Sequence, residues 1–168
     1  LNQVPIVIRQ GATLAHYNLL IRDTRFGIWF ANSLVVGTCA TTISTVVSIL
    51  AAYAIVRLRF RGSHLVGMGI FVTYLVPPTL LFLPLSRVVS ILGLGDSIWA
   101  LIVTYPTFLV PFCTWLLMGY FKSIPKEMEE CAMIDGASRM RVFWRIIIPL
   151  SLPGIFSAGI FAFTLSWN

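Results

Sequence analysis

Charge is scarce in this chain. Only 11% of its 168 residues are charged, whereas 58% are hydrophobic, and the mean hydropathy is +0.90. A water-soluble domain carries about 25% charged residues, so this composition excludes a soluble domain and indicates a chain embedded in lipid. Acidic residues are rarest, with six against twelve lysines and arginines and a net charge of +6. Because the charges lie in short gaps between long apolar runs, they indicate membrane topology rather than nucleic-acid binding.

The sequence also lacks the patterns of a catalytic or metal site. Cys39, Cys113 and Cys131 are scattered singly, without CxxC or Cys/His spacing, so we interpret them as free thiols and expect no metal site. His16 and His64 are lone residues outside the apolar runs, which favours a solvated or interfacial role over ligation. No HExxH helix, carboxylate pair or nucleophile with a base is recognisable, so we predict no catalytic residue and no enzyme activity.

The apolar runs are long enough to be transmembrane helices, since crossing about 30 Å of hydrocarbon takes about 20 helical residues. Four such runs cover residues 28–56, 65–92, 98–120 and 150–168. Arg57, Arg59 and Arg61 follow the first run without any acid, which predicts a cytoplasmic turn. Alternation of the spans then predicts that residues 122–149 are also cytoplasmic and that residues 1–26 are extracytoplasmic. The predicted fold is an all-α integral membrane protein, a polytopic transmembrane helix bundle in a single domain.

Two features of the runs indicate helices that face one another. Small and hydroxylated residues are dense in residues 28–56, which favours close helix contacts and bonds across an interface, although hydroxyls bonded to their own helix are the alternative. Pro77 and Pro78 interrupt the second run, and the carbonyls they leave without donors need neighbouring helices or water in a cavity. Broken helices of this kind line solute pathways, while a kink that improves packing is an equally weighted alternative. Pro77 and Pro78, with the polar Asn168 in the last run, are the candidate path residues.

Residues 122–149 form a long charged interval with the pattern of two short helices joined at a glycine. Pro125 suits the first turn of a helix. Three acids near the positive end of that helix follow it, namely Glu127, Glu129 and Glu130. Gly136 is the natural stop, and we expect it to take a positive φ.

A second helix is predicted to follow directly. Ser138 is a suitable N-cap, and the apolar residues behind it recur at helical spacing, at Met140, Phe143, Trp144 and Ile147. An exposed helix pair with such an apolar stripe is suited to dock in a groove of another protein. Lying on the bilayer surface is the alternative for the same stripe.

The order of residues in this interval resembles the EAA loop of ABC importer permeases. The usual form of that loop is E-A-A-x-x-x-G, nine further residues, and then I-x-L-P. This chain has Glu130 to Gly136, nine residues, and then Ile146 to Pro149. Cys131 in place of Ala and Ile148 in place of Leu are departures that keep size and apolarity similar.

Shorter matches extend the resemblance over nearly the whole chain and favour the maltose-type sugar permease branch. They are Asn32-Ser33-Leu34, then Ala51-Ala52-Tyr53-Ala54 with Arg57, Phe60, Arg61 and Gly62, and finally Trp167-Asn168.

The resemblance implies a permease subunit of an ATP-driven importer in a bacterial or archaeal cytoplasmic membrane, translocating a sugar. Its partners would be a second permease subunit, a pair of ATP-binding subunits and an extracytoplasmic solute-binding protein. The residues carried over as ATPase-coupling are Glu130, Cys131, Ala132, Asp135, Gly136 and Ala137, with Glu130 and Asp135 as polar anchors and the two alanines allowing close approach. That branch has six spans, so we expect this chain to be a fragment lacking the first and last helices.

Two patterns are missing from the sequence, and both absences indicate that transport would be driven by an energy source outside this chain, such as ATP. No acidic residue lies inside an apolar run, whereas a secondary transporter normally needs ionisable residues there to couple proton or sodium movement. No GxxxxGK[ST] loop occurs, so we expect no bound cofactor and an ATPase on a separate polypeptide. An importer of another small solute, such as an amino acid, peptide or polyol, is the alternative function. A non-transporting membrane scaffold is a further one.

Overall fold

The computed structural model describes residues 24–167, and this part of the chain is built from helices without strands. The elements are α2 (Phe26–Tyr53), η1 (Ala54–Leu58), α3 (Ser63–Tyr74), α4 (Pro78–Ile91), α5 (Ile98–Thr104), α6 (Pro106–Ser123), α7 (Glu127–Ile134), α8 (Arg139–Val142), η2 (Phe143–Ile147) and α9 (Ile148–Ser166). The two η elements are π-helical turns, in which the chain is wound slightly wider than in an α-helix.

Three helical runs are long and apolar enough to cross a membrane. They are Phe26–Leu58, Ile98–Ser123 and Arg139–Ser166, with 33, 26 and 28 residues. The last run differs from its sequence prediction, because α8 continues through η2 into α9 without a break. The second helix predicted in the charged interval is therefore not a separate element but the beginning of the last long helix.

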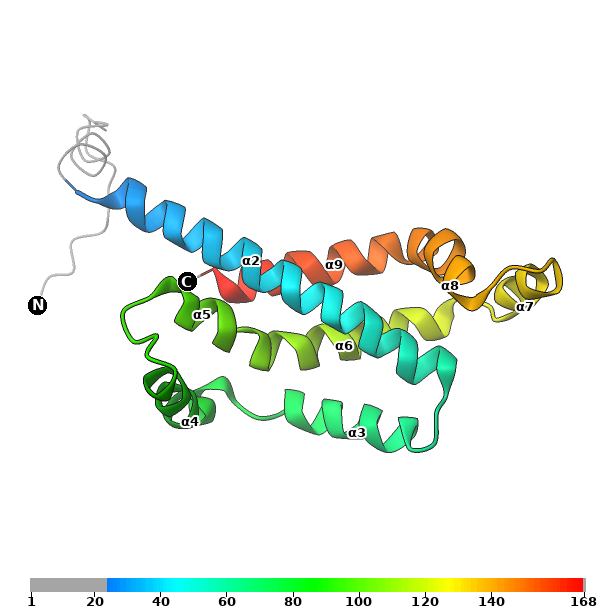
Figure 1. Ribbon diagram of the computed structural model, residues 1–168, viewed down its shortest axis with the longest axis horizontal. Coiled ribbons are helices and arrows are strands. Elements are labelled where there is room, and N and C mark those ends of the chain that lie inside the picture. The colour runs from blue at the N-terminus through cyan, green and yellow to red at the C-terminus, as the bar shows by residue number, and fades with distance from the viewer. Residues whose placement is uncertain (1–23, 168) are drawn as a thin grey trace, which may run out of the picture.

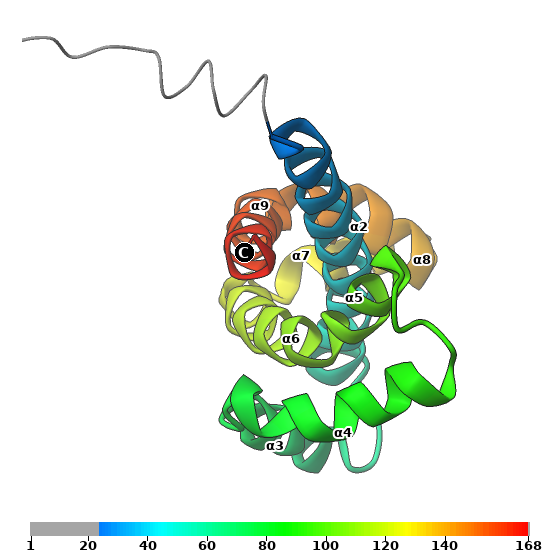
Figure 2. The same cartoon turned by 90° about the vertical axis from the view of Figure 1, so that its left-hand side faces the viewer.

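The second apolar run, predicted at residues 65–92, is divided into α3 and α4, which are bent by 96° relative to each other. Pro77 is the N-cap residue of α4 and Pro78 its first helical residue, positions where a missing N–H costs no helical hydrogen bond. Together α3 and α4 lie to one side of the remaining helices, as Figure 2 shows. α4 has no buried residue and α3 only Gly67, so this pair contributes little to the core.

The core lies between α2, α6 and α9, which contact one another. α2 contributes a fully buried stripe of small residues at every fourth position, namely Ala40, Ser44, Ser48 and Ala52. α6 contributes large buried side chains, including Leu109, Leu117 and Phe121. Small residues let the helix backbones approach closely, so α2 and α9 pack tightly around the bulky face of α6.

The hydroxyls of α2 follow both of the predicted alternatives. Ser48 Oγ donates across the interface to the Val110 carbonyl at 3.1 Å, whereas Thr42 Oγ1 donates to the Thr38 carbonyl of its own helix at 2.8 Å. Hydroxyls therefore contribute to the interface at particular positions rather than along the whole stripe.

The basic segments gather at one end of the bundle. Figure 1 shows the end of α2, the start of α3, and α7 and α8 together there, with the start of α2 and the connection from α4 to α5 at the opposite end. The turn with Arg57, Arg59 and Arg61 therefore lies beside residues 122–149, as alternating spans require.

Candidate functional site

The predicted docking element is formed by α7 and the turn behind it. Gly136 has a φ of +85°, so the expectation of a positive φ is confirmed. The amide of Gly136 donates to the Met133 carbonyl at 3.0 Å, and the amide of Ala137 donates to the Ala132 carbonyl at 2.9 Å. These two bonds are those of a Schellman motif, which satisfies the last carbonyls of a helix through a left-handed residue. The glycine thus ends α7 and sharply reverses the chain.

The next helix begins at once. Ser138 is the N-cap of α8, and its Oγ accepts a hydrogen bond from the Arg141 amide at 3.4 Å, as predicted from the sequence. Because α8 is continuous with α9, only Ala137 and the capping residue Ser138 separate the turn at Gly136 from the last long helix. A force on α7 therefore reaches α9 through a short connection.

The six residues predicted to couple to a partner divide into two groups. Glu130, Cys131, Asp135 and Gly136 are exposed and available to another protein. Ala132 and Ala137 are half-buried and pack against the hydrophobic core of this chain. Their small size therefore brings α7 close to its own bundle, a role that the spacing of the motif did not indicate.

The predicted apolar stripe is also divided. Phe143 and Ile147 are 4% and 0% exposed, whereas Met140 and Trp144 are 66% and 60% exposed. The expectation of one continuous exposed stripe is corrected accordingly: one side of the stripe belongs to the core, where the Phe143 ring lies 4.6 Å from that of Tyr53, measured between centroids. The exposed apolar surface of the loop comes instead from Met140, Trp144 and, at the end of α7, Ile134, which is 85% exposed.

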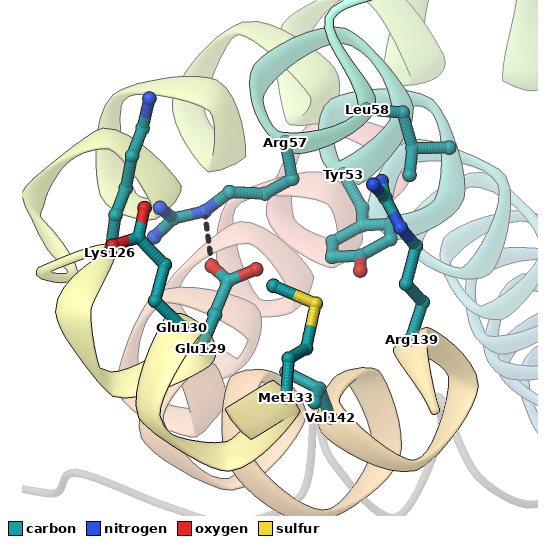
Figure 3. Close-up of a pocket in the computed structure, with 9 residues that line it drawn as sticks. All are labelled: Tyr53, Arg57, Leu58, Lys126, Glu129, Glu130, Met133, Arg139 and Val142. Carbon is teal, nitrogen blue, oxygen red and sulfur yellow. Dashed lines mark ion pairs between the residues drawn. The ribbon is translucent and has the colours of Figure 1, made fainter. Parts of the chain in front are cut away.

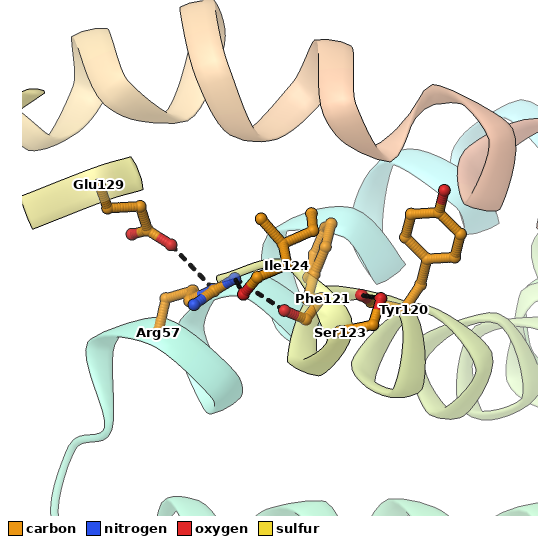
Figure 4. Close-up of polar contacts among 6 residues, drawn as sticks. All are labelled: Arg57, Tyr120, Phe121, Ser123, Ile124 and Glu129. Carbon is orange, nitrogen blue, oxygen red and sulfur yellow. Dashed lines mark hydrogen bonds and ion pairs between the residues drawn. The ribbon is translucent and has the colours of Figure 1, made fainter. Parts of the chain in front are cut away.

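Arg57 anchors this loop to η1, the π-helical turn that follows α2. Its Nε lies 2.9 Å from Glu129 Oε1 on α7, and the two side chains are 4% and 12% exposed. The same guanidinium donates through one terminal nitrogen to the carbonyls of Phe121 and Ile124, at 2.7 and 2.8 Å (Figure 4). The contact with Glu129 is an ion pair without hydrogen-bond alignment at Nε. One side chain thus joins three elements: η1, the end of α6 and the first turn of α7.

The electrostatic reasons for this arrangement are local. The last carbonyls of α6 have no helical donor and carry the negative end of the helix dipole, so they favour a cation. A planar guanidinium presents several donors in a fixed fork and can serve carbonyls and a carboxylate together. Sequence reasoning used Arg57 only as a marker of the cytoplasmic side. The available signal was its place directly after an uninterrupted apolar run, but nothing local identified Glu129 as its partner.

A small cavity of about 170 Å³ lies where α2, α7 and α8 meet (Figure 3). Arg57 and Glu129 line it together, and Tyr53 lies opposite, next to Arg139. Glu130 also lines the cavity but forms no ion pair within the part of the chain that the structure describes. This contact region, called the joint below, is thus a small cavity with charged side chains from η1, α7 and α8.

The candidate path residues lie elsewhere. Pro78 lines a cavity of about 1040 Å³ between α3, α4, α6 and α9, and Pro77 does not. Aromatic rings and hydroxyls dominate the wall of this cavity, including Tyr74, Tyr105, Phe112, Phe161 and Thr164. Asn168 lies outside the described residues. Of the three candidates, one is placed at a cavity large enough for a small solute.

Comparison with known proteins identifies the family. The profile of the family described as "Binding-protein-dependent transport system inner membrane component" matches residues 44–168. This chain belongs to that family. The matched segment includes α6, the whole loop with its Gly136 turn, and α9. Membership and the apolar helices together make it a membrane protein.

Individual relatives in this permease family cover the chain almost completely. It is 36% identical over 166 residues to the "Inner membrane ABC transporter permease protein YcjP" of Escherichia coli, covering 98% of this chain and 59% of the relative. It is 36% identical over 156 residues to the "Sulfoquinovosyl glycerol transport system permease protein SmoH" of Agrobacterium fabrum, covering 93% and 55%. It is 34% identical over 163 residues to the "Trehalose transport system permease protein SugB" of Mycobacterium tuberculosis, covering 96% and 59%. The chain thus spans under two thirds of the length of these relatives.

Proposed function

We propose that this chain is part of the permease subunit of an ATP-driven importer that translocates a sugar across a bacterial or archaeal cytoplasmic membrane as a multi-pass protein. A pair of separate ATP-binding subunits, a second permease subunit and an extracytoplasmic solute-binding protein would complete the transporter. The chain itself would bind no cofactor and catalyse no reaction. Support comes from the family and from relatives whose names specify trehalose and sulfoquinovosyl glycerol transport.

The observation that carries this proposal is the construction of the loop. An apolar side chain, Ile134, is 85% exposed at the end of α7, with Glu130 and Asp135 exposed nearby. Exposed apolar groups rimmed by polar residues mark protein interaction sites. Behind this face, the Arg57 contacts and the Gly136 turn fix α7 to the ends of α2, α6 and α9. A partner that moves α7 would therefore move the long helices with it.

The large cavity is the proposed solute path. Its aromatic rings can contact the C–H faces of a sugar, and its threonine and tyrosine hydroxyls can bond the sugar hydroxyls. The break between α3 and α4 at Pro78 lies against this cavity, which supports the candidate predicted from the sequence over a purely packing role.

The docking role is tested by Ile134→Asp in the complete transporter. A charge in place of the exposed apolar side chain should remove the contact with the ATP-binding subunit while leaving this chain folded, since Ile134 contributes little to the core. The measurement is co-purification of the ATP-binding subunit together with sugar uptake. Glu127→Gln, at an exposed position on the same helix, is the matched control. Undiminished co-purification with Ile134→Asp would refute docking at this face.

A further inference from the structure

A second cavity near the loop end of the bundle has a graded polarity. It measures about 540 Å³ and lies between α3, η1 and the end of α6. Its polar lining residues, Arg59, Ser63, His64 and Lys122, come from the last turn of α6, the turn after η1 and the first turn of α3. Residues one to two helical turns further along α3 and α6 are apolar: Met68, Phe71, Trp115 and Met118. The cavity therefore has a basic mouth and an apolar interior.

The positive charge at the mouth has no internal counter-charge. No Asp or Glu lines the cavity, and neither Arg59 nor Lys122 forms an ion pair among residues 24–167. The backbone adds to the same polarity, because α3 begins at Ser63 and no side chain caps its first amides. Two cations and a helix start facing one cavity attract an anion.

Backbone strain is found at this mouth as well. Arg59 ends η1 with a φ of 44°, and it is the only residue other than glycine with a positive φ in the described part of the chain. A residue with a Cβ is strained in such a conformation relative to its ordinary backbone. Its neighbour Arg57 is turned into the joint described above, so the two arginines serve different sites.

The interior suits a hydrocarbon chain. The rings of Phe71 and Trp115 lie 4.3 Å apart between centroids, and Met118 approaches so closely that a Cβ on Gly67 would lie 2.9 Å from its Cε. Aromatic and thioether side chains adapt to flexible apolar ligands. A water-soluble anion would contact only the mouth and leave this interior unused.

We propose that this cavity binds an anionic phospholipid, with the headgroup phosphate at Arg59 and Lys122 and an acyl chain along Phe71, Trp115 and Met118. Basic pockets between transmembrane helices at the cytoplasmic side recognise anionic headgroups, and the apolar groups of this one lie on helices of a membrane protein. The proposal depends on membrane embedding and not on which solute is transported. A lipid there would connect α3 to η1 and to the end of α6.

Trp115 provides the test. The complete transporter, with Trp115 as the only tryptophan of this chain and with tryptophan-free partners, is placed in nanodiscs of phosphatidylcholine with a minor fraction of phosphatidylglycerol. In one preparation the phosphatidylcholine carries bromine on its acyl chains, and in a second one the phosphatidylglycerol does. The quenching of Trp115 fluorescence is compared between the two. We expect brominated phosphatidylglycerol to quench several-fold more than its mole fraction predicts. Arg59→Gln with Lys122→Gln should abolish this preference, since each cation near an anionic surface contributes about fivefold in affinity.

The matched control is Arg61→Gln with Arg145→Gln, two basic residues of the neighbouring segments that do not line the cavity. It should leave the preference unchanged. Quenching by each lipid in proportion to its mole fraction overturns the proposal, as does the absence of quenching because another part of the transporter fills the cavity. Loss of the preference on adding soluble glycerol phosphate would also overturn it in favour of a free anion. Native mass spectrometry checks the result without tryptophan substitutions. The unmodified transporter should retain phosphatidylglycerol, and the variant with Arg59→Gln and Lys122→Gln should lose it.

Discussion

The Arg57 guanidinium joins three helical elements. Because carbonyls and a carboxylate surround this group, its size and shape matter as much for these contacts as its charge does. Two carbonyls at the end of α6 and the carboxylate of Glu129 surround it, and almost none of the group reaches solvent. Removing one member of a buried ion pair leaves an uncompensated charge, which costs about 3–5 kcal/mol. The joint is therefore sensitive to substitutions that a surface arginine would tolerate.

Arg57→Lys and Glu129→Gln are each predicted to reduce both stability and coupling. Lysine keeps the charge but cannot reproduce the fork, and glutamine leaves the arginine without its counter-charge. We expect a lower thermal midpoint and more ATP hydrolysed per sugar transported, measured in the reconstituted transporter. Arg61→Lys and Glu127→Gln are exposed controls on the same segments. The double variant Arg57→Met with Glu129→Gln should lose less stability than the sum of the single variants Arg57→Met and Glu129→Gln, and additive losses in that cycle would contradict a direct interaction.

Gly136→Val is predicted to leave membrane insertion near normal and to abolish or strongly reduce uptake. The φ of +85° costs about 1 kcal/mol for alanine and more for a branched side chain, although a Cβ there would meet no atom within 4 Å. The defect is therefore one of loop conformation rather than of packing. Gly95→Val is the matched control, because Gly95 is also unobstructed but has no positive φ in the strained range. Normal uptake by Gly136→Val at matched expression would contradict the coupling role of this turn.

At the scale of elements, small residues determine how closely α9 approaches α6. A Cβ on Gly154 would lie 2.6 Å from the Tyr120 ring, a distance that real side chains do not adopt. Gly154→Ala is predicted to destabilise the bundle by about 1–3 kcal/mol through overpacking, measured as a lower midpoint of thermal unfolding in detergent. Gly159→Ala, on the same helix with nothing within 4 Å, should be neutral or slightly stabilising. Equal midpoints for the two variants would contradict this packing.

The bend between α3 and α4 gives a second prediction for elements. Replacing Pro77 and Pro78 by alanine permits a continuous helix and should move α4 away from the large cavity, which changes the KM for sugar uptake. Pro84→Ala is the control, since Pro84 lies within α4 and does not line that cavity. Unchanged uptake kinetics with the double variant would make the proline pair a packing feature only.

The sequence predicted the elements well where the signal is local. Apolar runs indicated the long helices, and the stop at Gly136 and the cap at Ser138 follow from single-residue chemistry. The 96° bend was not predicted, because a proline pair permits a break but neighbouring helices set its angle. The Arg57 to Glu129 ion pair was missed because it joins segments far apart in the sequence. The stripe from Met140 to Ile147 was only partly interpreted correctly, since helical spacing does not distinguish a side buried within the chain from one that faces a partner.

At the scale of the whole molecule, basic residues and the docking loop share one end of the bundle. The turn with Arg59 and Arg61, the start of α3, and α7 and α8 are gathered there (Figure 1). Positive charge near the ends of transmembrane helices is typically retained on the cytoplasmic side. We therefore predict that this end faces the cytoplasm, where ATP-binding subunits would reach α7, and that the connection from α4 to α5 faces outward.

Thiol labelling in intact cells tests this orientation, and the chain supplies a probe of its own. Cys131 is an exposed free thiol on α7, whereas Cys113 is buried. An impermeant maleimide should leave Cys131 unmodified until the membrane is permeabilised, and cysteines introduced at Ser63 and Ser138 in a background without Cys131 should behave in the same way. Asp96→Cys, in the connection from α4 to α5, should react in intact cells. Strong labelling of Ser63→Cys or Ser138→Cys from outside would reverse the assignment of sides, and with it the location of the proposed ATPase contact.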